Sequence, residues 1–414
     1  MKPAPYYVLA IALAMGAVLI GVEIPSWVSL LTPAVALQSD FRVFYTPGYM
    51  LRSGQRKSIY DFPAIRRNQN ERVAADNASV PFLHPAYEAV IFVPLSFLKY
   101  RTAYIVWAFV NFCMLGLSVF LLRPCLPALS GIGPQWILLA LTLGFMPVAF
   151  AILAGQDSLL LLLILILVFR RIGSNELQGG FLLSLGVFRF QVLLPIVALF
   201  LLWRSFKFFA GWIIGSGVLL SLSAAITGIA AQIQYLHLLR AMGSVSFWLL
   251  LRRMANLRAL LAAYGFGLVP LLLVSAFIFI LGAIIGAKQE SRQRLPLAIS
   301  VSAMVTYYLF LHDLSVMTLS LLLAIDGAID RRAWLRAALP AAVLAGFSVF
   351  WFARDHFYLG ALLTSIFFVS KVGDLPPRSR LNPVYSARVK IPSEPNQAAP
   401  EINAGGGRDL GPNN

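Results

Sequence analysis

Long apolar runs dominate this chain and limit what it can fold into. Hydrophobic residues make up 59% of its 414 residues and charged residues only 12%, and the mean hydropathy is +0.79. Such runs suit a lipid environment, where a spanning segment must satisfy its own backbone hydrogen bonds and a helix does so without a partner. We therefore expect an all-α polytopic membrane protein rather than a soluble domain.

The lengths of the apolar runs predict a bundle of about 10–12 transmembrane helices, since a straight span needs about 20 residues. A first span at about residues 5–23 is followed by a long polar loop over 24–83, in which 41–52 has the pattern of a short interfacial helix and 54–80 looks irregular. Several later runs are too short for a full span, and we interpret them as short or discontinuous helices. The later helices are expected at about 85–98, 101–122, 134–153, 157–169, 207–229, 259–286, 295–312, 314–326, 335–353 and 357–370.

Basic residues give the chain a formal net charge of +16, and they form short clusters between the apolar runs. This is the positive-inside pattern of membrane proteins, so it indicates a multi-pass membrane protein and argues against a nucleic-acid partner. With the basic clusters in the cytoplasm, the 24–83 loop, a 230–258 loop and all four histidines fall on the extracytoplasmic side. Residues 1–371 then form the transmembrane domain, and the polar tail 372–414 is expected to be disordered and cytoplasmic.

One apolar segment, 178–203, has basic residues near both of its ends, and its centre holds Arg189 with Pro195 following. Two half-helices that turn near mid-membrane explain this pattern, and backbone that is not helical at such a depth must be buried in protein or line a cavity. Arg189 at the turn would be a buried cation that an anion could match. The alternative is an ordinary helix from which Arg189 snorkels to one surface.

Asp40 is the acid that we expect to carry chemistry. It lies at the start of the polar loop, directly before Phe41, and a carboxylate so close to a bilayer is costly unless it has a function. The alternative is that Asp40 caps the helix that begins at Phe41, since Asp is a favoured N-cap residue. One base with several outward-facing cations suits group transfer from a phosphate-linked donor, because the base deprotonates an acceptor hydroxyl and the cations stabilise the departing phosphate. The aromatic residues Tyr45 and Tyr87 are candidates for stacking on a sugar.

Six short motifs follow one another in a fixed order over about residues 35–320. They are Ser39-Asp-Phe-Arg-Val-Phe-Tyr45 ending in Ile59-Tyr-Asp61, His84-Pro-Ala-Tyr-Glu-Ala89 before Val93-Pro-Leu-Ser-Phe97, Gly155-Gln-Asp-Ser-Leu159, Phe188-Arg-Phe-Gln191, Met254-Ala-Asn-Leu-Arg-Ala-Leu260 and Leu311-His-Asp-Leu314. Together they resemble glycosyltransferase family 87, the polyprenol-phosphate-dependent GT-C enzymes that include mycobacterial α-1,2-mannosyltransferases. The chain departs from the family pattern at Ala86 and Phe190, where the family has proline, at Arg189, where it has lysine, and at Ala259, where it has glycine.

The resemblance implies a GT-C-like hexosyltransferase, such as a mannosyltransferase. Such an enzyme moves one sugar from a polyprenyl-phosphate donor to a lipid or glycan acceptor on the extracytoplasmic face of the membrane. Asp40 matches the general base proposed for the family, and His312 matches a position near the donor phosphate. No cofactor is expected, with a divalent metal left open, and the partners are the sugar donor, the acceptor and membrane lipids. The expected donor-binding residues are His312, Arg189, Gln156, Arg258, Asn256, Tyr45 and Tyr87.

Several alternatives remain open at the level of sequence. Gln156 and its neighbour Asp157 either bind sugar hydroxyls or cap the helix that follows them. Asp313 is a possible secondary acid, or it orients His312 or caps the next helix. Glu88 lies one helical turn after His84, so the two side chains can face each other, and Glu88 is a further possible acid.

The function also has an alternative of a different class. A lipid or small-solute transporter, or a flippase, would use the broken 178–203 segment, because transporters build their binding sites from discontinuous helices.

Overall fold

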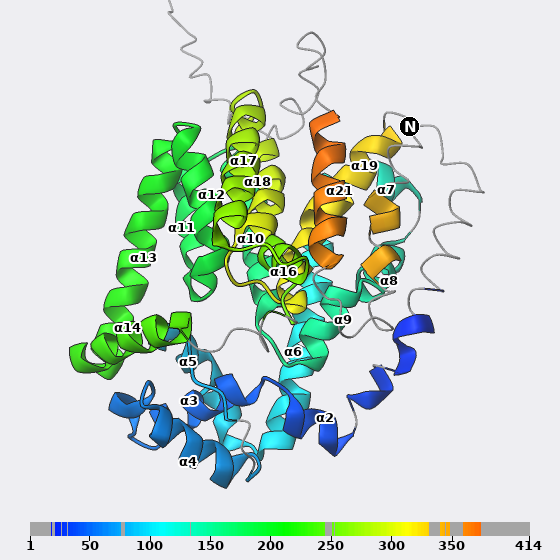
Figure 1. Ribbon diagram of the computed structural model, residues 1–414. Coiled ribbons are helices and arrows are strands. Elements are labelled where there is room, and N and C mark those ends of the chain that lie inside the picture. The colour runs from blue at the N-terminus through cyan, green and yellow to red at the C-terminus, as the bar shows by residue number, and fades with distance from the viewer. Residues whose placement is uncertain are drawn as a thin grey trace, which may run out of the picture. The chain divides into compact units, whose positions relative to one another are not determined.

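The computed structural model of the protein is helical throughout the part of the chain that it describes (Figure 1). It describes residues 18, 21–25, 27–30, 32–75, 79–132, 134–244, 251, 253–330, 340–343, 345–347 and 359–373. Within these ranges there are helices and no β-strand, which confirms the all-α prediction. Most of the expected spans at 5–23 and 335–353, and the tail after Gly373, lie outside the described residues.

Four helical stretches are long and apolar enough to cross a membrane, or up to six if each of two bent helix pairs is one span. They confirm a polytopic helical membrane protein. Among the described residues, the number of spans is below the expected 10–12 because several apolar runs are broken into shorter helices. The 134–153 run bends by 72° between α8 (Gln135–Leu143) and α9 (Met146–Leu153). The stretches are Tyr100–Cys125, which contains α6 (Tyr100–Leu122), α13 (Phe206–Thr227), α17 (Leu268–Ala287) and Leu311–Ile329, which contains η5 (Leu311–Val316) and most of α19 (Met317–Asp330).

One further run also differs from the sequence prediction. The expected 259–286 helix divides into α16 (Leu257–Ala263) and α17, and Gly265, whose φ is +79°, reverses the chain between them. A positive φ is strained for residues other than glycine, so a helix ends readily at such a position.

The other described elements are α2 (Pro33–Gln38), α3 (Arg42–Arg52), η1 (Arg56–Ser58), α4 (Phe62–Arg72), α5 (Ala86–Phe92), η2 (Pro94–Phe97), η3 (Arg123–Cys125), α7 (Pro127–Ile132), α10 (Ser158–Ile172), α11 (Glu176–Ser184), η4 (Val187–Arg189), α12 (Phe190–Leu202), α14 (Ile229–Ser244), α18 (Ser291–Val305) and α21 (Leu359–Gly373).

Two segments that we expected to be loops contain helices. The 54–80 stretch contains α4, which starts with proline in its first turn and buries Ala64 and Ile65. The 230–258 stretch contains α14, which buries Ala231 and Tyr235 on one face. Helix α4 is polar on its other side, whereas α14 exposes Ile229, Ile233 and Leu236 there. In both helices, contact of a few apolar residues with the aromatic core adds stability beyond helix propensity.

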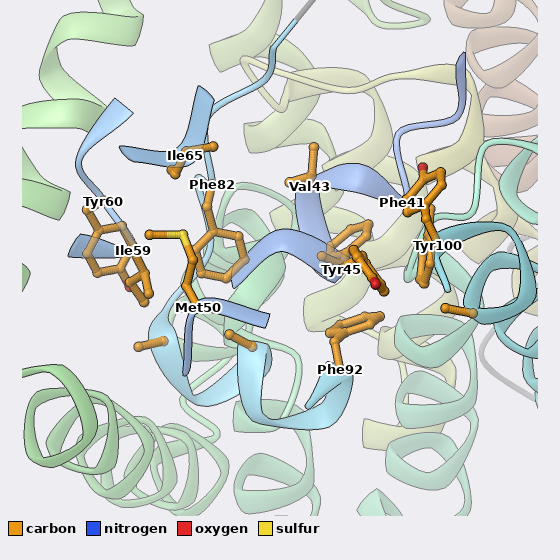
Figure 2. Packing of buried hydrophobic residues seen from close by; sticks show 14 of the residues in the cluster. Phe41, Val43, Tyr45, Met50, Ile59, Tyr60, Ile65, Phe82, Phe92 and Tyr100 are labelled. Atoms are coloured by element: carbon orange, nitrogen blue, oxygen red, sulfur yellow. The ribbon is translucent and has the colours of Figure 1, made fainter. Parts of the chain in front are cut away.

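That core joins the polar loop to α5 and to the long span α6, which contributes Tyr100, Tyr104 and Trp107 (Figure 2). Phe41 is fully buried, and its ring lies 5.6 Å from Tyr100 and 6.5 Å from Trp107 between centroids. Phe44 stacks on Phe92 at 4.9 Å. Aromatic pairs at such distances add about 0.5–1.5 kcal/mol each beyond their buried area. The loop is therefore a packed layer in which α3 is held against α5 and α6.

The 178–203 segment is broken as its sequence predicts. Helix α11 ends at Ser184, η4 carries the chain around the turn, and α12 departs at 70° to α11. The start of α11 and the end of α12 come together, because the Ser205 hydroxyl lies 3.4 Å from Oε1 of Glu176. Both ends of the segment therefore lie on the same side, and Arg189 lies at the turn.

Helix α13 runs parallel to α11 and packs very closely on it. A Cβ at Gly211 would lie 2.0 Å from the Leu177 carbonyl oxygen, and one at Gly215 would lie 2.0 Å from Oγ of Ser184. Small residues at such contacts let two helix backbones approach each other in a membrane. This packing fixes the turn of the broken segment relative to α13.

The basic ends of several helices meet at one end of the bundle. Ser291, at the start of α18, donates to Glu176 at 2.5 Å, and Arg294 donates to Ser205 at 3.3 Å. Arg292 lies 2.9 Å from the sulfur of Cys125, just after α6. Helices α3, α4, α5 and α14 gather at the opposite end, near the lower edge of Figure 1. Basic side chains also occur at this second end, where Arg52, Arg56 and Arg72 belong to α3, η1 and α4.

Candidate active site

Asp40 is brought to the Gly155 turn by a close contact of two backbones. Gly155 has φ +66°, and a Cβ at this position would lie 2.7 Å from Cβ of Phe41. Only glycine fits both the conformation and the contact. Tyr104 and Trp107 of α6 hold the same turn by donating to the carbonyl oxygens of Leu153 at 2.7 Å and Gly155 at 3.0 Å.

Gln156 links this acid to the cation of the broken helix. Its amide nitrogen donates to Oδ2 of Asp40 at 2.8 Å, and its amide oxygen accepts from Nη2 of Arg189 at 2.6 Å. Asp40 is partly exposed, whereas Gln156 and Arg189 are buried. The N-cap of α3 is Phe41, and the backbone carbonyl of Asp40 accepts from Val43 at 2.8 Å, so Asp40 lies directly before the helix while its carboxylate bonds to Gln156.

Arg189 is surrounded by carboxylates. Its Nε donates to Oδ1 of Asp157 at 2.9 Å, its Nη2 also contacts that oxygen, and its Nη1 lies 3.3 Å from Oδ1 of Asp313. A buried guanidinium with one partner on each side is the kind of charge pair that tolerates burial. The snorkelling alternative is therefore wrong, since Arg189 is buried inside the protein.

His84 and Glu88 extend the network on the side of α5. Nδ1 of His84 lies 2.6 Å from Oε2 of Glu88 and 3.8 Å from Oδ2 of Asp157. The expected contact between His84 and Glu88 is thus present. Burial lowers the pKa of His84 to about 4, and burial followed by the charge of Asp157 raises the pKa of Glu88 well above its usual range. Burial therefore acts against the charged form of both groups.

His312 lies next to Asp313 at the start of η5. Its Nε2 is 3.5 Å from Oδ1 of Asp313, and neither ring nitrogen has a hydrogen-bond partner among the described residues. Its ring is stacked near Phe150 and Phe310, at 6.3 and 5.7 Å between centroids. Asp313 accepts from the backbone N–H of Phe310 at 2.9 Å, so it caps this turn and contacts the histidine as well.

Asn256 and Arg258 hold the segment that leads to His312. The amide of Asn256 accepts from Ala259 at the start of α16 and donates to the carbonyl oxygen of Thr306 at 2.6 Å. The guanidinium of Arg258 lies 3.6 Å from the ring centroid of Tyr307. In the described residues these two side chains hold the loop before the histidine.

Tyr45 and Tyr87 are tied to backbone groups. The Tyr45 hydroxyl donates to Leu98 at 2.8 Å, and the Tyr87 hydroxyl donates to Leu185 and accepts from the N–H of Phe188, both at 3.1 Å. Tyr87 therefore supports the turn that carries Arg189. Tyr45 also lines an open pocket of about 410 Å³ with basic residues on its walls, namely Arg52, Arg72 and Lys99.

The structure thus brings five of the expected residues into one connected group, Asp40, Gln156, Arg189, Asp313 and Glu88, with His312 beside it. Asp157 lies at the centre of this group, although from the sequence alone it could equally be a sugar-binding residue or a helix cap. It makes no side-chain capping bond to α10. Its signal in the sequence is the need of a buried Arg189 for a nearby anion.

The arrangement joins a partly exposed carboxylate to a buried set of charges in which acids outnumber the one guanidinium. Asp40 is the partly exposed carboxylate, and the amide of Gln156 donates to it. His84, Glu88 and Asp157 lie so close that one ligand atom of each falls within 4.8 Å of the others, so these three residues could hold a metal ion.

A comparison with protein families identifies the family to which these motifs belong. A family model described as glycosyltransferase family 87 matches residues 82–312, a range that includes His84, Gln156, Arg189 and His312 and begins after Asp40. No curated protein and no solved structure matched the chain. The family match covers more than half of the chain, and with the helical membrane architecture it leads to one conclusion. The chain belongs to glycosyltransferase family 87.

Proposed function

We propose that this glycosyltransferase transfers a single hexose, such as mannose, from a polyprenyl-phosphate donor to a lipid or glycan acceptor on the extracytoplasmic face of a bacterial inner membrane. Asp40 serves as the general base. The observation that carries the proposal is the hydrogen bond of 2.8 Å from Gln156 to Asp40, which holds a partly exposed carboxylate at the edge of a buried polar network.

The reaction follows from the position of one base. Asp40 takes the proton of the acceptor hydroxyl while its oxygen forms a bond to the anomeric carbon of the sugar. The bond between that carbon and the phosphate oxygen breaks, and polyprenyl phosphate leaves with the electron pair. A single displacement of this kind inverts the configuration at the anomeric carbon. Asp40 acts as a base and forms no covalent intermediate.

Two groups support binding of the donor phosphate. His312 is buried and its ring nitrogens have no hydrogen-bond partner among the described residues, so it can donate to a phosphate oxygen. The pocket beside Tyr45 has Arg52, Arg72 and Lys99 on its walls, and such cations suit an anionic headgroup of donor or acceptor. In this proposal Arg189 orients Gln156 and Asp157, and its charge adds to the field at the phosphate.

The proposed sidedness rests on the two ends of the bundle. The basic ends of α11, α13 and α18 lie together, and by the positive-inside rule they face the cytoplasm. The end that carries α3 and Asp40 then faces outward. Labelling of single cysteines introduced at Gln55 and Lys288 with a membrane-impermeant reagent tests this: only the Gln55 variant should react in intact cells.

Reconstituted full-length protein tests the chemistry. Purified chain in lipid vesicles is given polyprenyl-phosphate hexose and membrane lipid extract, and the transferred sugar is counted. Asp40→Asn and Asp40→Ala should each lower the rate by about 10²- to 10⁴-fold, while Glu290→Gln, an exposed carboxylate at the other end of the bundle, should not change it. Wild-type activity in both Asp40 variants removes Asp40 from the mechanism.

The family match favours an enzyme over the transporter that the broken helix left open. The same vesicles decide between them. A transporter would move labelled donor lipid or solute across the membrane without forming a glycosidic bond, and it would be insensitive to Asp40→Asn.

A further inference from the structure

The carboxylates around Arg189 outnumber the cations that compensate them. Glu88, Asp157 and Asp313 contribute three buried acids, and Arg189 contributes the single buried guanidinium in contact with them within the described residues. Burying a carboxylate without a partner is costly. Asp313 and Asp157 both contact Arg189, which leaves Glu88 to be accounted for.

Glu88 points into the cluster. Its side chain is fully buried, and its Oε2 lies 2.6 Å from Nδ1 of His84. Oδ2 of Asp157 is also buried and lies 3.8 Å from the same nitrogen. Two carboxylates that face each other at close range must share a proton or a cation.

His84 supplies a nitrogen ligand to the same point. Its ring is held by stacking on Phe82 at 5.5 Å and by the edge of Phe44 at 5.2 Å, and its backbone carbonyl accepts from Tyr60. These contacts aim Nδ1 at Glu88 and Asp157. A ring fixed in this way is typical of a histidine that binds a metal.

We infer that His84, Glu88 and Asp157 form a binding site for one divalent transition-metal ion. One imidazole nitrogen and two carboxylates suit Mn²⁺ or Zn²⁺ better than Mg²⁺, which prefers oxygen ligands and keeps several waters. Metal–ligand bonds of about 2.1 Å place opposite ligands about 4.2 Å apart, and the three atoms here already lie within 4.8 Å of one another. An ion at this site also offsets the excess of buried negative charge.

The site goes beyond the proposed sugar transfer, and it is tested without any donor or acceptor. Full-length protein in detergent is stripped with chelator and titrated with Mn²⁺, and free Mn²⁺ is measured by electron paramagnetic resonance. The wild type should bind one ion per chain. Glu88→Gln and His84→Gln should each weaken binding by more than the roughly 10- to 100-fold that loss of an outer-shell partner costs. Glu290→Gln, an exposed carboxylate far along the chain, should bind like the wild type.

A spectroscopic readout protects the test against a variant that does not fold. Pulsed resonance of Mn²⁺ bound to wild-type protein should show coupling to a directly bound imidazole nitrogen, and His84→Gln should remove that coupling. Absence of a stoichiometric ion in the wild type would mean that Glu88 shares a proton only, and the inference would be overturned. Binding that both variants retain, or bound Mn²⁺ without nitrogen coupling, would overturn it equally.

Discussion

Gln156 and Asp157 are neighbours in sequence, yet they serve two very different regions of the molecule. Gln156 reaches outward to Asp40, whose carboxylate is partly exposed and is held by one amide. Asp157 reaches inward to a buried group in which it shares the guanidinium of Arg189 with Asp313. In the proposed function the outer region exchanges the proton, because its carboxylate is partly exposed.

The inner region has the opposite property. Its charged groups are buried, so each depends on another protein group for compensation, and removal of one leaves the others buried without a partner. We therefore expect substitutions in the inner region to act on stability and those in the outer region to act on rate. The following substitutions test that division.

Arg189→Met should have the largest effect on folding. It leaves Asp157 and Asp313 buried without their cation, which costs about 3–5 kcal/mol for a broken buried pair. Thermal unfolding of purified protein in detergent, followed by intrinsic fluorescence, should show a much lower midpoint. Arg171→Met, at an exposed arginine that ends α10, is the matched control. An unchanged midpoint for Arg189→Met would show that the inner charges do not depend on one another.

Gln156→Ala should reduce sugar transfer by about tenfold, since a hydrogen bond from a neutral amide to a charged carboxylate contributes about 1.5 kcal/mol or more. Asp40 keeps its carboxylate in this variant but loses the amide that orients it. Initial rates with saturating donor measure the effect, and Gln178→Ala, on the exposed face of α11, serves as the control. A loss as complete as that of Asp40→Asn would instead indicate that Gln156 itself contacts the substrate.

Tyr104→Phe should lower stability by about 0.5–1.5 kcal/mol, the net contribution of one hydrogen bond. The lost bond joins α6 to Leu153, just before the Gly155 turn. The measurement is the same unfolding midpoint, with Tyr264→Phe at an exposed tyrosine for comparison. No difference between the two variants would mean that α6 does not support the turn.

Asp40→Asn should have the smallest effect on stability, within about 0.5 kcal/mol, because the asparagine keeps the shape and can still bond to Gln156 while Asp40 is partly exposed. Its unfolding midpoint should match the wild type even though its transfer rate falls. A marked loss of stability would place Asp40 with the inner group and would contradict the division between the two regions.

Hydropathy and charge were sufficient to predict the helical membrane class and the break around Arg189, because both follow from the cost of exposing polar groups to lipid. The helices α4 and α14 could not be predicted in the same way. Helix α4 is short and polar, and α14 has 16 residues, fewer than a straight span needs. Both helices pack on the aromatic core. The division of 259–286 depended on Gly265, whose positive φ is invisible in a hydropathy pattern.

The candidate site could also be predicted only in part from the sequence. The motifs indicated Asp40, Gln156 and Arg189 separately, and the contact between Phe41 and Gly155 that brings them together depends on packing over more than a hundred residues of separation. Tyr45 and Tyr87 carried an aromatic signal that is the same for a sugar platform and for a packed core. Their hydroxyls turned out to bind backbone groups, which sequence alone does not reveal.

The tether between Glu176 and Ser205 has a consequence for the way the chain threads through a membrane. A segment whose two ends are tied together does not change compartment, although a hydropathy count would score it as a crossing. Everything downstream of it would be assigned to the wrong compartment by such a count. Reporter enzymes fused after Ser174 and after Ser205 should therefore give the same signal, and the next change of signal should come only after α13.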